Sequence, residues 1–343
     1  MAWPSACNST FEHRPLSNRA STMMTRKLAA IWLLGSVLNH AQALDDCREI
    51  RKMPQGGRSL TMAKPIDAPG KYCLAENVES PRLYTIEGER HGYNQPVLDV
   101  DASDVDVDLQ GHAIVANTSE MNGIVLFALD AHSRPISHVS IRNGTVTART
   151  SGAIRFGFSL GSLLSDFLTM YHGDEQLANA AVDDLQRVTL AQYPLTGHVI
   201  DNMKVRANTG GGSGAGGAVG IGMKGSHNII RNSTIEITDG HAAIYLFGPG
   251  NIIENNTIIF RGHSAFESAA AIKLHQADGT IIRNNDIVID APMFGKAPAA
   301  AIALVDSKGV VIENNRLRGI KTLVKAWDDK SDFSIVDDGK NNR

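Results

Sequence analysis

The sequence has few cysteines, few aromatic residues and no excess of positive charge. It contains 3 cysteines in 343 residues, and 6% of its residues are aromatic. The 33 lysines and arginines against 36 acidic residues leave a formal charge of −3, so no electrostatic sign of nucleic-acid binding is present. No segment reaches about 18 consecutive apolar residues, so no transmembrane helix is predicted. With 43% hydrophobic and 20% charged residues, the composition excludes a wholly disordered chain and a coiled coil.

Motifs of several common enzyme sites are also missing. The chain has no zinc-ligand spacing, no nucleophile elbow and no dinucleotide fingerprint. Residues 210–217 (GGGSGAGG) lack the Gly-Lys-Ser/Thr ending of a phosphate-binding loop, which favours a flexible turn. Asp104, Asp106 and Asp108 suggest calcium, but they would follow one strand face about 6.7 Å apart in succession, so all three cannot bind one ion. The three aspartates are expected to be the exposed polar positions of an alternating strand. No cofactor is predicted, although two of the aspartates could share a Ca²⁺ ion with a neighbouring coil.

Residues 23–43 have the pattern of a secretory signal peptide. Two basic residues precede a short apolar run, and the sequence AQA at 41–43 fits the small-x-small rule for cleavage. Cleavage is predicted before Leu44, which implies an exported chain, periplasmic or extracellular. A retained anchor helix is the alternative. Residues 1–22 are either an over-extended start or a disordered leader.

Export also bears on the cysteines. The mature chain would keep Cys47 and Cys73, which are expected to form a disulfide in an oxidising compartment. Such a bridge would close a loop of about 26 residues and stabilise the fold by about 3 kcal/mol. Two free buried thiols are the alternative.

The second half of the chain repeats a short motif of two apolar residues, a charged residue and asparagine. The motif reads IIRN, IIEN, IIRN and VIEN, and its asparagines are Asn232, Asn255, Asn284 and Asn314, at spacings of 23, 29 and 30. A second strand motif, Ala-Ile-x-Leu, lies between these blocks at 243–246, 271–274 and 301–304. Three short strands per period are typical of one coil of a parallel β-helix, whose stacked asparagines form ladders and sharp corners. An all-β solenoid is therefore predicted.

These repeats resemble the single-stranded right-handed parallel β-helix of the pectin-lyase-like superfamily, over about residues 60–336. Residues 66–74 (IDAPGKYCL) resemble the opening segment of many such domains, and residues 105–114 (VDVDLQGHAI) resemble a strand of carbohydrate-associated β-helix repeats. The resemblance implies a polysaccharide partner but not a reaction, because this fold hosts lyases, hydrolases, epimerases, esterases and adhesins. The clustered aspartates of galacturonan hydrolases and the Asp-Pro-His-Asp motif of mannuronan epimerases are absent from the sequence.

The repeats also predict how the chain is divided. After the leader and signal peptide come an N-terminal lead-in and cap (44–104), the parallel β-helix (105–336) and a polar tail (337–343). The tail would cap the open end of the solenoid. Residues 160–192 lack the strand repeat and are interpreted as a partly helical insertion between coils. The insertion either covers a groove or shields the outside of the solenoid.

The outward positions of the Ala-Ile-x-Leu-x strands are the candidate site. Side chains alternate along a strand, so the x positions face outward and stack across coils. One predicted column holds Arg155, Gly222, Tyr245, Lys273 and Ala303, and the next holds Gly157, Lys224, Phe247, His275 and Val305. His241 comes within reach from a neighbouring turn. The two columns would form a basic and aromatic patch on a chain of net negative charge, or else an ordinary solvated strand face.

This patch suggests lyase-type cleavage of an acidic polysaccharide. Cations pair with uronic-acid carboxylates, and aromatic rings offer flat faces to sugars. Lys273 or His275 would take the C5 proton and Tyr245 would protonate the leaving oxygen. The substrate-binding residues would be Arg155, Lys224, Phe247 and His241. Two alternatives stay open: a non-catalytic glycan-binding or structural cell-envelope β-helix, and a glycoside hydrolase.

Overall fold

The structure is a computed structural model of the chain. It describes residues 47–53, 63–80, 95–117, 121–126, 134–149, 152–157, 195–208, 218–264, 268–290 and 297–336. The predicted leader, signal peptide, polar tail and helical insertion (160–192) lie outside these residues. All regular elements of the described part are β-strands, and that part contains no helix able to cross a membrane.

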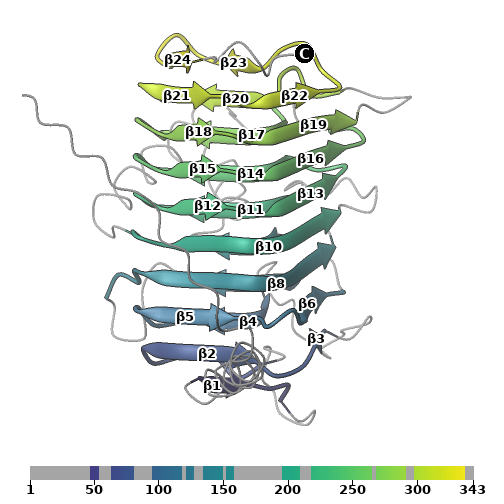
Figure 1. Ribbon diagram of the computed structural model, residues 1–343, viewed down its shortest axis with the longest axis vertical. Coiled ribbons are helices and arrows are strands. Elements are labelled where there is room, and N and C mark those ends of the chain that lie inside the picture. The colour runs from purple at the N-terminus through teal and green to yellow at the C-terminus, as the bar shows by residue number, and fades with distance from the viewer. Residues whose placement is uncertain are drawn as a thin grey trace, which may run out of the picture. The chain divides into compact units, whose positions relative to one another are not determined.

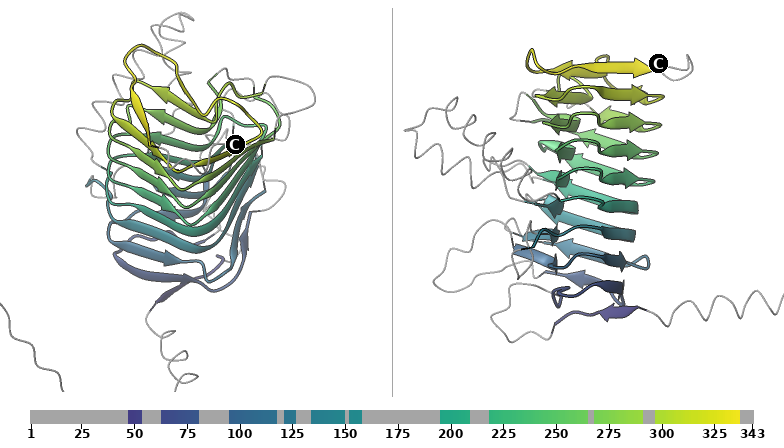
Figure 2. Two further views of the ribbon diagram at one scale, coloured as in Figure 1. Left: turned by 45° about the horizontal axis from the view of Figure 1, so that its top comes forward. Right: turned by 90° about the vertical axis from the view of Figure 1, so that its left-hand side faces the viewer.

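The strands form coils that are stacked from β1 to β24 (Figure 1). All pairings between named strands are parallel, and they build one 16-stranded and one 8-stranded sheet. The further views in Figure 2 show the strands of successive coils aligned one above another. This arrangement is the all-β parallel solenoid that the repeats predicted.

Each coil from β2 to β23 contributes to each of three faces, and β1 and β24 extend the first face alone. The first face consists of β1 (Arg48–Ile50), β2 (Gly70–Leu74), β5 (Val105–Asp108), the first parts of β8 (Val139–Arg149) and β10 (Val199–Asn208), β12 (Ile229–Arg231), β15 (Ile252–Glu254), β18 (Ile281–Arg283), β21 (Val310–Glu313) and β24 (Phe333–Val336). The second face consists of β3 (Val78–Glu79), β6 (Ala113–Ala116), the last parts of β8 and β10, β13 (Thr234–Thr238), β16 (Thr257–Arg261), β19 (Asp286–Asp290) and β22 (Arg316–Arg318). The third face is the 8-stranded sheet of β4 (Gln95–Val100), β7 (Met121–Leu126), β9 (Gly152–Phe156), β11 (Val219–Lys224), β14 (Ala242–Phe247), β17 (Ala270–His275), β20 (Ile302–Val305) and β23 (Val324–Ala326).

Asparagines make the corner between the first and second faces. The asparagines of the repeat adopt the left-handed backbone conformation, with φ of 53° at Asn232, 56° at Asn255, 55° at Asn284 and 52° at Asn314. The asparagine that follows each of the last three is buried and continues a ladder. Asn256 Nδ2 donates to Asn285 Oδ1 at 3.0 Å, and Asn285 Nδ2 donates to Asn315 Oδ1 at 2.9 Å. These residues are therefore structural, as the repeat predicted.

The inward side chains form a continuous apolar core. The second isoleucine of each repeat lies in one column, and Ile230, Ile253, Ile282 and Ile312 are each at most 1% exposed. Burying such a side chain contributes about 1.5–3 kcal/mol. The core therefore sets the register of the coils, and with it the register of the outward side chains.

Parallel pairing begins earlier in the chain than residue 105. β1 pairs with β2, and β2 with β5, within the segment that the sequence assigned to a lead-in and cap. The structure contains the predicted disulfide between Cys47 and Cys73, whose Cα atoms are 5.7 Å apart. The bridge joins the chain just before β1 to β2, so it ties the first coil to the next.

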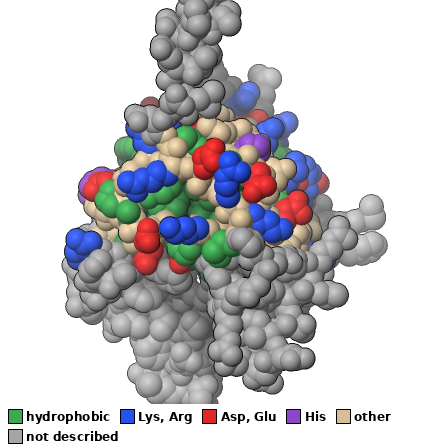
Figure 3. Space-filling model, turned by 90° about the horizontal axis from the view of Figure 1, so that it is seen from below, with side chains coloured by type: hydrophobic (Ala, Val, Ile, Leu, Met, Phe, Trp, Pro, Cys, Tyr) green, Lys and Arg blue, Asp and Glu red, His purple; other side chains and the backbone are tan. Residues whose placement is uncertain are grey.

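Outward charges on the first and second faces are paired across coils. On the first face Arg142 contacts Asp106 at 2.9 Å and Asp108 at 3.4 Å. On the second face Arg261 lies 2.7 Å from both Glu236 and Asp290. Basic and acidic side chains are also intermixed at the end formed by the first coils (Figure 3). The aspartate run thus contributes to ion pairs, and no three His, Cys, Asp or Glu residues of the described part are arranged to hold a metal.

Candidate functional site

The strand register brings the predicted site residues into two columns on the third face. In the first column, Gly222 pairs with Arg155 and Tyr245, and Tyr245 pairs with Lys273. In the second column, Phe247 pairs with Lys224 on one side and with His275 on the other. Neighbouring members lie on adjacent strands, so their backbones are about 4.8 Å apart.

The third face differs from the other two in its charges. The outward strand positions from β9 to β20 hold cations, aromatic rings and small residues, and none of them holds a carboxylate. On the first and second faces, carboxylates and arginines alternate from coil to coil. Among the outward strand positions that the structure describes from β9 to β20, the third face therefore holds cations and no carboxylate.

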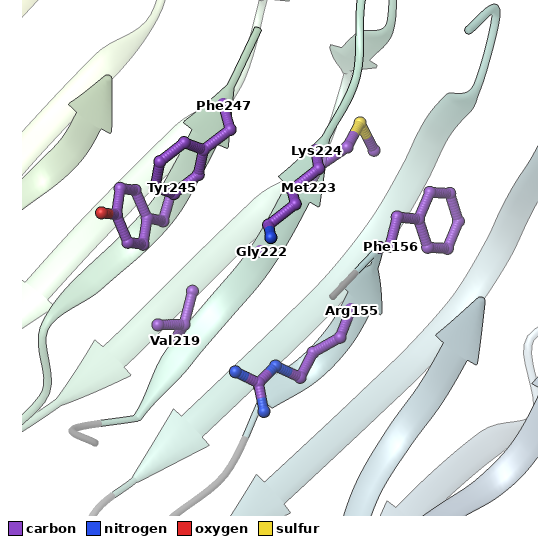
Figure 4. A pocket seen from close by; sticks show the side chains of 9 residues that line it. Arg155, Phe156, Val219, Gly222, Met223, Lys224, Tyr245 and Phe247 are labelled. Atoms are coloured by element: carbon purple, nitrogen blue, oxygen red, sulfur yellow. The ribbon is translucent and has the colours of Figure 1, made fainter. Parts of the chain in front are cut away.

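Gly222 leaves a small hollow in this face, partly open to solvent. Figure 4 shows Arg155 of β9, Lys224 of β11 and Tyr245 of β14 around it. A Cβ atom at Gly222 would meet only Val219 Cγ1, at 3.6 Å. The space exists because Gly222, which has no side chain, lies between Arg155 and Tyr245 in the first column.

Lys224 lines the hollow with an amine of unusual acidity. Burial, and then the charge of Arg155, lower the pKa of Lys224 to about 7. The residue is 4% exposed, and its Nζ lies 5.8 Å from the centre of the Phe247 ring. Close to pH 7, a large share of the molecules therefore carries a neutral amine that can accept a proton.

Arg155 supplies the positive charge beside that amine. Burial lowers the pKa of Arg155, but a guanidinium stays charged throughout the physiological pH range. Its planar donors suit a carboxylate. The hollow therefore combines a group that can accept a proton with a group that can hold an anion.

The remaining predicted residues form a packed cluster one coil further on. Lys273 Nζ lies 2.9 Å from His241 Nε2 and donates to Ser268 Oγ at 2.7 Å. The Tyr245 ring lies 5.2 Å from both the His241 ring and Lys273 Nζ, and its hydroxyl is 3.5 Å from His275 Nδ1. Burial, and then the charge of Lys273, lower the pKa of His241, so its imidazole is neutral and can accept a hydrogen bond from Lys273. Lys273 and His275, predicted as bases, are buried next to Tyr245 and do not line the hollow.

Part of this chain matches a known family of repeats. A family model described as a right-handed beta helix region matches residues 193–338. The chain is a right-handed parallel β-helix protein. No curated protein matches this β-helix protein.

Two solved structures are similar to it in part. The Agl-KA catalytic domain is 10% identical with a TM-score of 0.23, and the match covers 91% of this chain and 66%, just under two thirds, of that one. The surface protein and adhesin PfbA of Streptococcus pneumoniae is 10% identical with a TM-score of 0.20, and the match covers 79% of this chain and 81% of that one. Neither similarity bears on what this β-helix protein does.

Asp99 is a candidate functional residue that the patch did not include. It lies on β4 in the first column, where it pairs with Val125, which in turn pairs with Arg155. Burial, and then the nearby charge of Asp101, raise the pKa of Asp99 to about 7. The sequence did not mark Asp99 as a site residue, because its coil lacks the Ala-Ile-x-Leu signature. The β-helix protein thus carries a carboxyl of high pKa two rungs from the hollow.

Proposed function

We propose that this β-helix protein is exported and cleaves an acidic polysaccharide by β-elimination in the hollow at Gly222. The observation that supports this most is that one hollow is lined by an amine with a pKa of about 7, a guanidinium and a phenol. β-Elimination from a uronic acid needs these three functions at one sugar. The excess of cations on the third face suits an acidic polymer.

Each group has a defined part in the reaction. Arg155 pairs with the uronate carboxylate, which makes the C5 proton more acidic. The neutral Lys224 amine takes that proton, the electron pair of the C5–H bond forms the C4–C5 double bond, and the C4–O bond breaks. Tyr245 donates its proton to the leaving oxygen. The products are one chain with an unsaturated sugar and one with a free hydroxyl.

Lys224 is a better candidate for the base than Lys273 or His275. Lys273 is held by Ser268 and His241, and neither Lys273 nor His275 lines the hollow. In this proposal they support the Tyr245 ring, which is packed between His241 and Phe247. His275 and Lys273 then act as positioning residues for the phenol.

The test is the ultraviolet absorbance of the unsaturated uronide, followed on pectate, alginate and hyaluronan with and without Ca²⁺. Lys224→Met should lower the rate by about 10²- to 10⁴-fold, the usual contribution of a general base. The matched control is Lys204→Met, which removes an exposed lysine from β10 on the second face and should leave the rate unchanged. Equal rates in the two variants would exclude Lys224 as the base.

Glycan binding without cleavage is the second candidate function. Lys224, Lys273 and His275 are each less than a tenth exposed, and the aromatic rings of the patch are packed against one another. A rigid surface of this kind suits glycan binding as well as catalysis. A binding protein would show saturable binding of an acidic polymer with no new absorbance.

Hydrolysis is the third candidate, and Asp99 supports it. A glycosidase needs a carboxylic acid of raised pKa and a second carboxylate, and Asp99 and Asp101 are two neighbouring carboxyls of which one has a raised pKa. Hydrolysis would release reducing ends without unsaturation, and Asp99→Asn would abolish that release.

A further inference from the structure

The last described coil carries a lysine and a tryptophan on the same outward columns as the hollow. We infer that Lys325 and Trp327 form a second binding station for the acidic polymer, remote from the hollow. This inference rests on the proposed function, in that it assumes an acidic polysaccharide on the third face. It names which part of the molecule holds the chain of sugars beyond the one that reacts.

Strand register aligns the two residues with the site. Lys325 of β23 pairs with Ala303, and Ala303 pairs with Lys273. The Trp327 backbone N–H donates to the Leu304 carbonyl at 3.0 Å, which continues the same pairing by one residue. Lys325 therefore extends the first column and Trp327 extends the second.

The two side chains form a unit suited to an acidic sugar. Lys325 Nζ lies 3.6 Å from the centre of a Trp327 ring, which is a close cation–π contact. Lys325 is exposed and Trp327 is half-buried, so both reach the surface of the third face. An indole offers an apolar face to a sugar ring while the adjacent ammonium pairs with its carboxylate.

The spacing of the two stations requires a polymer. Lys325 lies three rungs beyond Tyr245, which is about 14 Å at about 4.8 Å per rung. A sugar in the hollow cannot also contact Trp327. A chain of several sugars can contact both, and the second contact then acts at a high effective concentration.

The sequence offers a direct probe, because the chain has only three tryptophans, Trp3, Trp32 and Trp327. In the full chain with Trp3→Phe and Trp32→Phe, Trp327 is the sole source of tryptophan fluorescence, whether or not a signal peptide is removed. Pectate and alginate are titrated against this protein, with neutral dextran as the control polymer. A saturable change in emission with an acidic polymer, and none with dextran, is the expected result.

Two substitutions separate the station from the hollow. Lys325→Met should weaken the affinity for the acidic polymer, measured by fluorescence, by about 3- to 5-fold. This is the usual contribution of one exposed ion pair. Lys321→Met, a matched loss of an exposed lysine in the same coil, should leave that affinity unchanged. Trp327→Ala should raise KM for long polymer by about tenfold, with kcat and the cleavage of short oligosaccharides unchanged. Trp327→Phe keeps an aromatic ring, so its KM for long polymer should lie between those of wild type and Trp327→Ala. This intermediate value would distinguish loss of the ring from a folding defect.

The outcomes distinguish this inference from the proposed function. An emission change without any cleavage would support the station and refute the lyase. Cleavage with no emission change, and with unchanged KM in Trp327→Ala, would overturn the station while the lyase stands. Equal weakening in Lys325→Met and Lys321→Met would also overturn it, because the effect would then be one of general charge.

Discussion

Replacing His198 should make the protein more resistant to acid. His198 is fully buried directly before β10, and it accepts a hydrogen bond from the Val139 backbone N–H through Nδ1 at 3.2 Å. On the next coils the same bond is accepted by asparagines: His198 N–H donates to Asn228 Oδ1, and Asn228 N–H donates to Asn251 Oδ1, both at 2.9 Å. His198→Asn therefore puts the ladder's usual residue in place of an imidazole.

The size of the effect follows from the pKa. Burial, and then the charge of His138, lower the pKa of His198 from 6.5 to about 3. The unfolded chain binds a proton below pH 6.5 that the folded chain refuses, so stability falls as the pH drops from 6.5 towards 3. At pH 5 this costs about 2 kcal/mol, and near pH 3 it reaches about 4 kcal/mol. The Asn variant lacks this loss, although it also lacks the edge-on contact of His198 with the Phe156 ring, 5.1 Å between centroids.

The assay is urea unfolding of wild type and His198→Asn at pH 8 and pH 5. The contact with Phe156 affects both pH values equally, so the quantity of interest is the change between them. The loss of unfolding free energy from pH 8 to pH 5 should be smaller in the variant by about 2 kcal/mol. His112→Asn, at a half-buried histidine of another coil, is the control for removing an imidazole. An identical loss in wild type and His198→Asn would refute the reasoning.

Four further predictions concern the hollow, the ladder and the disulfide. Gly222→Leu should fill the hollow and lower the cleavage rate by at least about tenfold, whereas Gly222→Ala, whose Cβ meets only Val219 Cγ1 at 3.6 Å, should retain activity and stability, measured by uronide absorbance and thermal unfolding. The rate should rise with pH as Lys224 loses its proton near pH 7, and Arg155→Met should move that rise to higher pH because the charge of Arg155 helps to lower the pKa of Lys224. Asn285→Ala should cost about 2–4 kcal/mol in urea unfolding, because it removes the acceptor of the Asn256 backbone N–H and three further hydrogen bonds of the Asn285 side chain. Cys47→Ser with Cys73→Ser should cost about 3 kcal/mol, and no loss would mean that the bridge does not constrain the unfolded chain.

The repeat made the fold and the register of the third face predictable. Because the coils of the repeat carry the same Ile columns, aligning the motifs aligns Tyr245 with Lys273 and Phe247 with His275, and the structure has these pairs. The same alignment puts Gly222 between Arg155 and Tyr245. The periodicity of the core thus determines which outward side chains are neighbours.

The contacts and chemical roles of these outward side chains were less predictable. A motif gives no sign that Lys273 is held by His241 and Ser268 on a turn of variable length, or that Lys224 faces the space that Gly222 leaves. Asp99 and Trp327 lie on coils whose third-face strands lack the Ala-Ile-x-Leu motif, so the repeat did not assign them to the columns. Only the pairing of β4 with β7, and of β23 with β20, shows that they share a face with the hollow.

The mass of the products from an acidic polymer tests the central claim most directly. Elimination breaks the C4–O bond without adding water, whereas hydrolysis adds one water for each bond cleaved. Mass spectrometry of the products formed from pectate, alginate or hyaluronan should show unsaturated oligosaccharides that lack this water, and they should be absent with Lys224→Met. Products that have gained water, or intact polymer that is bound but not cleaved, would contradict a lyase in the hollow at Gly222.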